Sequence, residues 1–74
     1  MHLEKITWLD SHSPTATWVD PDEVRTSPCV IKSVGYVVRE TKTAITIAAS
    51  VSDEGIVNAP LTIPLVCITK RKRI

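Results

Sequence analysis

The residues best suited to chemistry stand together in one short segment near the N-terminus, Asp10-Ser11-His12-Ser13. Serine, histidine and aspartate are the residue types of a hydrolytic triad, in which a base activates a serine beside an oxyanion hole. A working triad usually gathers its members from separated segments, whereas neighbours in one loop more often cap one another's backbone amides. We therefore expect a capped loop here, no catalytic residue, and a protein that is not an enzyme.

Two cysteines and two histidines could together supply four zinc ligands: His2, His12, Cys29 and Cys67. Structural zinc sites place their ligands in close pairs, and neither cysteine has a second ligand at such a spacing. Each cysteine lies in an apolar stretch, and free cysteine is among the most buried residue types. We expect both thiols to be reduced, buried and free of metal, and we expect no cofactor.

The sharpest charge feature is the basic run Lys70-Arg71-Lys72-Arg73. It holds four of the nine basic residues, so the rest of the chain, with five basic and eight acidic residues, is slightly acidic. In a strand these four side chains would alternate between two faces. Two interpretations stay open: the run contacts nucleic-acid phosphates, or its charge keeps a terminal strand from pairing with other chains. No aromatic residue lies beside the run to stack a base, which favours the second interpretation.

Two tryptophans are the bulkiest side chains of a chain that has no Phe. Trp8 alternates with Thr7 in an apolar run, so we predict that Trp8 packs in the core. Trp18 stands beside a loop, and exposed tryptophans often anchor interfaces. Trp18 therefore joins the basic run as a candidate contact for a partner.

Val, Ile and Thr are abundant, and their β-branched side chains favour strands over helices. The alternation of apolar residues predicts one all-β domain over residues 1–74, with strands at 3–9, 29–39, 44–51, 56–63 and 68–74. A small open sheet with one packed helix is the alternative fold. Because so short a chain builds a small core, oligomerisation is a reasonable way to bury more apolar surface.

Particular residues predict the connections between these strands. Asp20 and Pro21 suit the N-cap and first position of a single helical turn. Gly35 interrupts a long strand and predicts a bend or bulge, and Pro60 predicts an edge or bulged strand. Polar turns are expected at 40–43 and 52–55.

The overall balance of residues excludes several classes of protein. With 43% hydrophobic and 23% charged residues and a net charge of +1, the chain is neither a disordered acidic nor a disordered basic polymer. No apolar run approaches the ~20 residues that a membrane span needs, so no membrane partner is expected. The N-terminus lacks the pattern of a signal peptide, which predicts a cytoplasmic protein.

This succession of strands and turns resembles the small SH3-like barrels, of which the Sm-like proteins are one branch. Gly35 stands where Sm-like proteins place the glycine that bends their second strand, and residues 63–68 stand at the turn between their last two strands. The resemblance covers most of residues 28–74 and implies a five-stranded barrel with one short helical turn. Residues 8–13 also resemble part of small proteins encoded by bacteriophages, which implies the host cytoplasm.

The chain departs from the Sm-like proteins where they hold a base. Pro64-Leu65 replaces their Arg-Gly pair, and Thr41-Lys42-Thr43 lacks the Asp and Asn of their hairpin. Their nucleotide pocket is therefore not expected here. The resemblance implies a non-enzymatic interaction or assembly module, because Sm-like rings form when strand edges pair between subunits. We expect a homo-oligomer that could also bind a protein partner; nucleic-acid binding (RNA or DNA) by the basic C-terminal strand is the alternative.

Overall fold

The fold is a single antiparallel sheet. The computed structural model describes all residues from 1 to 74 and contains strands and two short 3₁₀ turns but no α-helix. The strands are β1 (Leu3–Asp10), β2 (Cys29–Glu40), β3 (Ala44–Val51), β4 (Val57–Pro64) and β5 (Ile68–Arg73). The all-β prediction is confirmed, every predicted strand boundary agrees to within one residue, and the packed helix of the alternative fold is absent.

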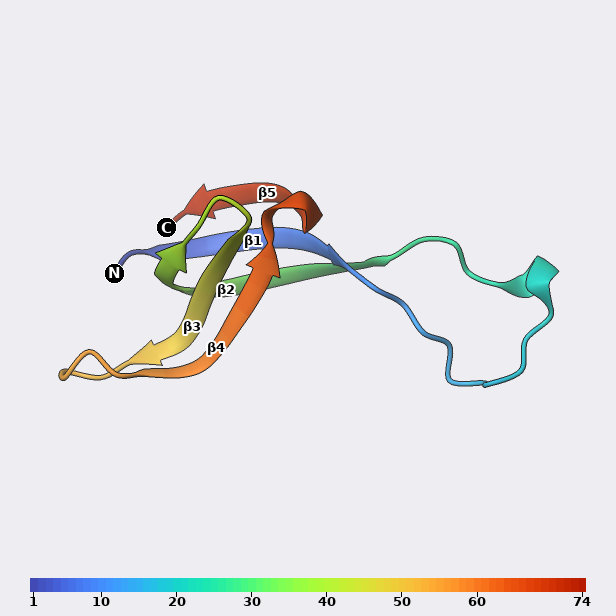
Figure 1. Cartoon of the computed structure of the whole chain (residues 1–74), viewed down its shortest axis with the longest axis horizontal. Helices are drawn as coiled ribbons and strands as arrows, with labels where there is room; N and C mark the ends of the chain where they lie inside the picture. The colour runs from blue at the N-terminus through green and yellow to red at the C-terminus, as the bar shows by residue number, and fades with distance from the viewer.

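The strands follow the order β4-β3-β2-β1-β5 in the sheet. The first four strands are joined as successive neighbours, and β5 returns beside β1, so β4 and β5 are the two edge strands. The return brings the two ends of the chain close together (Figure 1). Pro60 lies in the edge strand β4, as predicted, where a residue without an N–H costs no ladder hydrogen bond if its nitrogen faces outward.

The core is a small cluster of isoleucines from β1 and from the neighbouring pair β3 and β4, which is not adjacent to β1. Ile6 of β1 packs with Ile45 and Ile47 of β3 and with Ile63 of β4, although β2 separates β1 from β3. The sheet must therefore curl so that its two halves face each other, and the strong curvature of β2 is visible in Figure 1. Trp8 packs against this cluster, which confirms the prediction.

Gly35 is required by the close approach of β3 to β2. A Cβ at this position would lie 2.9 Å from the carbonyl oxygen of Ala48 and 3.0 Å from Cβ of Ile47. The register shift of β2 against β3 lies between Val37 and Arg39, so the irregularity comes three residues later than the glycine. The prediction of a bulge at Gly35 itself is thus corrected: the glycine makes room for β3 at the start of the curled segment.

The turns follow local chemistry. Gly55 has a φ of 82°, which explains the glycine at the end of the β3–β4 turn, and the amide of Ile56 donates to the hydroxyl of Ser52 over 3.1 Å. In the β2–β3 turn the hydroxyl of Thr41 accepts from the amide of Ala44 at 3.2 Å. Both turns occur where the polar residues predict them.

The connection from β1 to β2 is an arm formed by residues 11–28. It extends away from the sheet in Figure 1 and gives the molecule a length of 51 Å against a width of 21 Å. Its one regular element is the 3₁₀ turn η1 (Pro21–Glu23), where a carboxylate oxygen of Asp20 accepts from the amide of Asp22 at 3.0 Å. The predicted capped turn is confirmed, and no residue of the arm is buried.

Candidate binding surfaces

The basic run lies on the edge strand β5, and the pleat divides it between the two faces of the sheet. Lys72 lies opposite Lys5 of β1, and Lys70 lies opposite Thr7. On the other side of β1, Thr7 lies opposite Lys32 of β2. Because cross-strand partners share a face, lysines from three adjacent strands gather on the outer face.

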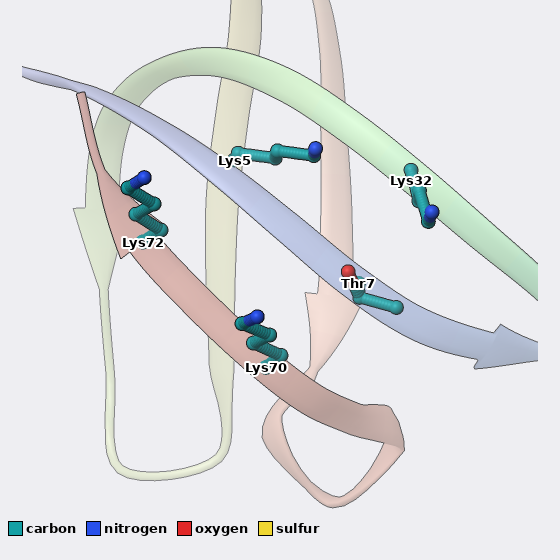
Figure 2. Close-up of a pocket in the computed structure, with 5 residues that line it drawn as sticks. All are labelled: Lys5, Thr7, Lys32, Lys70 and Lys72. Atoms are coloured by element: carbon teal, nitrogen blue, oxygen red, sulfur yellow. The ribbon is translucent and has the colours of Figure 1, made fainter.

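These residues line a hollow of about 330 Å³ that contains no hydrophobic side chain, the lysine hollow: Lys5, Thr7, Lys32, Lys70 and Lys72. Figure 2 shows their side chains above the neighbouring strands β2, β1 and β5. All four lysines are exposed, and none of them forms an ion pair within the chain. The hollow therefore concentrates positive charge that nothing in the chain neutralises, and it can bind anionic groups.

The sequence pattern predicts two of these four lysines. Lys70 and Lys72 were candidate residues, and their predicted common face is confirmed. Lys5 and Lys32 were missed, because their positions in the chain lie far from the basic run. The detectable signal was their place in predicted strands, but only the return of β5 beside β1 shows that the four charges meet.

Arg71 has a different environment from the two lysines beside it. It lies opposite Ile6 on the inner face, and there it contacts two carboxylates. Its Nε and Nη2 donate to Glu4 over 2.8 and 2.9 Å, and its Nη1 and Nη2 donate to Glu40 over 3.0 and 2.9 Å. His2 Nε2 lies 2.8 Å from the same Glu4 carboxylate and completes an ion cluster of four residues.

The ion cluster shifts the protonation of its members. The hydrogen bonds from Arg71, aided by His2, outweigh the effect of burial and lower the pKa of Glu4 to about 2. The hydrogen bonds from Arg71 also lower the pKa of Glu40, and the two carboxylates together raise the pKa of Arg71. Glu4 is 6% exposed, so this arrangement keeps a buried carboxylate ionised and paired.

The four basic residues are divided between the two faces of the sheet, as the alternation of a strand predicts. Lys70 and Lys72 face the outer hollow, whereas Arg71 holds Glu4 and Glu40 and is unavailable to a ligand. Arg73 shares the inner face, at a position opposite Glu4, and forms no ion pair. Replacing Arg71 would leave the buried Glu4 carboxylate with His2 as its one remaining side-chain partner, so Arg71 belongs to the fold as well as to the charge of β5.

The arm exposes apolar side chains to solvent. Trp18 is 93% exposed, and Val19 and Val24 are also exposed. A tryptophan with no intramolecular contact is a typical anchor for an interface. The role of Trp18 as a partner contact stays a prediction, and its complete exposure on the arm is consistent with that role.

A second hollow of about 270 Å³ is apolar. It lies where β2 diverges from β3 and β4, and six of its seven lining residues are hydrophobic: Ser33, Val34, Ile47, Ala48, Ala49, Ala59 and Leu61. Val34 is 57% and Leu61 39% exposed, so this part of the sheet leaves apolar surface in water. The small core and this open surface have the same cause, which is that the sheet does not cover all its apolar residues.

The remaining sequence candidates lie apart from these surfaces. A carboxylate oxygen of Asp10 accepts from the amide of Ser11 at 2.8 Å, which is the capping expected of the loop. His12 Nδ1 lies 3.6 Å from Sγ of Cys29, and Cys67 lies in the 3₁₀ turn η2 (Leu65–Cys67) between β4 and β5. No cluster of three or more His, Cys, Asp or Glu is present.

Both cysteines are free thiols, but the prediction that they are buried is wrong. Cys29 and Cys67 are each partly exposed. The physical reason is their location: Cys29 begins β2 beside the exposed arm, and Cys67 lies in a short turn at the edge of the sheet. An apolar neighbourhood in sequence does not ensure burial where an element has only one packed side.

Comparison of the chain with family models, with curated proteins and with solved structures gave no match. The structure contains no helix that could cross a lipid bilayer.

Proposed function

We propose that this protein is a non-enzymatic assembly module, a small SH3-like or Sm-like barrel that forms homo-oligomers through the edges of β4 and β5. The observation that carries the proposal is the burial of only seven of 74 residues, together with an exposed arm and one edge each of β4 and β5 that has no neighbouring strand. A second copy of the chain would supply the missing contacts and the missing apolar burial.

The barrel is supported by the core and by the ion cluster. Ile6 of β1 packs with Ile45 across the intervening β2 and with Ile63 across β2 and β3. Arg71 of β5 reaches Glu40 at the far end of β2. Both contacts require a sheet that is rolled rather than flat. After η2, Ile68 at the start of β5 packs against the same cluster, so the last strand begins close to the end of β4.

The two edges suit pairing between copies. An edge strand presents unpaired N–H and C=O groups to which another chain can bind. If β4 of one copy pairs with β5 of the next, the contact is head-to-tail and generates a ring when the rotation closes. The prolines of β4 restrict such pairing to a matched partner, because they discourage indiscriminate edge contacts.

The arm adds a second contact. Its exposed Trp18 and the apolar hollow beside β4 are unpartnered surfaces of the same chain, and both gain from exclusion of water. Interfaces typically concentrate their binding energy in a few aromatic anchors. Trp18 is the side chain of the arm best suited to that role.

Light scattering coupled to size-exclusion chromatography tests this proposal. The expected result is a particle whose mass is a multiple of the 8.2 kDa chain, with slow hydrogen exchange at the amides of β4 and β5. Trp18→Ser should shift the distribution towards smaller species, whereas the control Ile56→Ser, which removes an exposed side chain outside the arm, should not. A monomer at all accessible concentrations would contradict the proposal.

A further inference from the structure

The lysine hollow has no role in the edge pairing proposed above. It lies on the outer face of the sheet, it is lined by four lysines and one threonine, and none of the four charges has an acidic partner in the chain. Unneutralised like charges repel, so their gathering on three neighbouring strands costs stability unless an anion binds there.

The chemistry of the lining indicates which anion fits. Protein interfaces have apolar and aromatic centres, whereas nucleic-acid interfaces are polar and strongly positive. The hollow has no hydrophobic residue at all. A lysine is a point charge on a flexible stem, which suits phosphate contacts that need charge rather than a fixed geometry.

The arrangement also indicates the form of the nucleic acid. Two residues apart on β5, Lys70 and Lys72 are separated by about 7 Å, and β2 and β5 lie about 10 Å apart across β1. No aromatic residue lines the hollow, so it offers no platform on which the bases of a single strand could stack. A duplex needs no such platform and carries one charge per about 1.7 Å of its axis.

We propose that the lysine hollow binds the phosphate backbone of a nucleic-acid duplex without reading its sequence. The contact is formed by Lys5, Lys32, Lys70 and Lys72, and it excludes Arg71, whose guanidinium is held by Glu4 and Glu40. Phosphate contacts fix position on a duplex but carry no direct base information. The affinity is therefore expected to depend on salt and to be nearly the same for different sequences.

Fluorescence anisotropy with a labelled DNA duplex of mixed sequence, and with one of its strands alone, provides the test. The duplex should bind more tightly than the strand at low salt. If each lysine neutralises one phosphate, log K should fall with log salt at a slope of about 3.6. The variant Lys70→Ser/Lys72→Ser should weaken duplex binding at least about tenfold and lower the slope by about 1.8.

A matched control removes the same charge elsewhere. Arg39 and Lys42 are exposed, form no ion pair and lie outside the hollow. The variant Arg39→Ser/Lys42→Ser should therefore retain the affinity and slope of the natural chain. Both double variants should keep the circular dichroism and the particle mass of the natural chain, because exposed unpaired charges contribute little to stability.

Three results would overturn the proposal. One is the absence of salt-dependent duplex binding, and another is an equal loss of affinity in the two double variants. The third is a changed particle mass in Lys70→Ser/Lys72→Ser together with binding of a peptide of residues 11–28. That result would assign the hollow to the acidic arm of a second copy. Failure of the edge-pairing proposal is a separate outcome, because it appears as a monomer that still binds DNA.

Discussion

A side chain at position 35 would collide with the backbone of β3. The ideal Cβ lies 2.9 Å from the carbonyl oxygen of Ala48, which cannot move without disturbing the ladder. We expect Gly35→Val to lower the free energy of unfolding by about 1–3 kcal/mol through overpacking. Urea denaturation followed by circular dichroism measures this change. The adjacent control Val34→Ala, at a side chain 57% exposed, should change it far less, and equal effects would contradict the close-approach argument.

Two arginines of the same strand and face should differ in their effect on stability. Arg71 pairs with buried Glu4, whereas Arg73 has no ion pair. We expect Arg71→Gln to destabilise by about 2–3 kcal/mol, somewhat less than for a fully buried pair because the Arg71 side chain is 32% exposed. Arg73→Gln should cost much less. Thermal and urea unfolding of both variants test this prediction. A similar loss of free energy of unfolding in both would show that the ion cluster does not stabilise the fold.

Glu4 should make stability depend on pH in acid. Its pKa is lowered from 4.5 to about 2, so between these values the unfolded chain binds more protons than the folded chain. The contribution of Glu4 is therefore complete above pH 4.5 and is lost as the pH falls towards 2. A pKa lowered by about 2.5 corresponds to about 3 kcal/mol.

Urea titrations between pH 6 and pH 2.5 (roughly the window over which carboxylates titrate) measure this dependence. Glu4→Gln should flatten the curve, whereas Glu23→Gln, at an exposed carboxylate in the arm, should leave it unchanged. If the free energy of unfolding falls with pH in parallel for the natural chain and for Glu4→Gln, another group controls the stability in acid.

At the scale of elements, the arm is the segment least supported by the rest of the molecule. It is exposed over its full length, and apart from the contact of His12 with Cys29 its side-chain hydrogen bonds are local, such as that between the amide of Asp22 and Asp20. Exposed loops are the preferred sites of proteolysis. In dilute solution trypsin should therefore cut after Arg25 before it cuts after Lys42, which lies in a hydrogen-bonded hairpin turn.

Assembly should protect this site. If the arm contacts a second copy, the rate of cleavage at Arg25 should fall as the protein concentration rises, with cleavage at Lys42 as the internal reference. Mass spectrometry of the fragments measures both rates. A cleavage rate at Arg25 that does not depend on concentration would mean that the arm stays free in the particle.

At the scale of the whole molecule, the small core predicts that folding is linked to association. Four isoleucines form the buried cluster, and only seven of 74 residues are buried. A partner that binds the folded chain alone stabilises it by mass action. The melting temperature should therefore rise with protein concentration in scanning calorimetry. Over a hundredfold range of protein concentration, association would add about 2.7 kcal/mol to the stability of the folded chain. A melting temperature that stays constant over this range would show that one chain is stable by itself.

Much of the fold could be read from local residues. Five strands, a capped turn at Asp20 and Pro21, and the turn ending in Gly55 follow from alternation and from the conformational limits of single residues. These features depend on neighbours in the chain, so the sequence by itself determined them. It also determined that Lys70 and Lys72 share one face of a strand, because the pleat has a period of two.

The candidate site depended on tertiary structure. Lys5 and Lys32 lie beside Lys70 and Lys72 because β5 returns beside β1. Arg71 does not contribute to this basic surface, because the curled sheet places it against Glu4 and Glu40. The exposure of both cysteines likewise follows from where the sheet ends. A local pattern states which side chains share a strand face. Packing between segments far apart in the chain decides which strands become neighbours and which face of the sheet is covered. This packing therefore decides where the positive charge of the protein gathers.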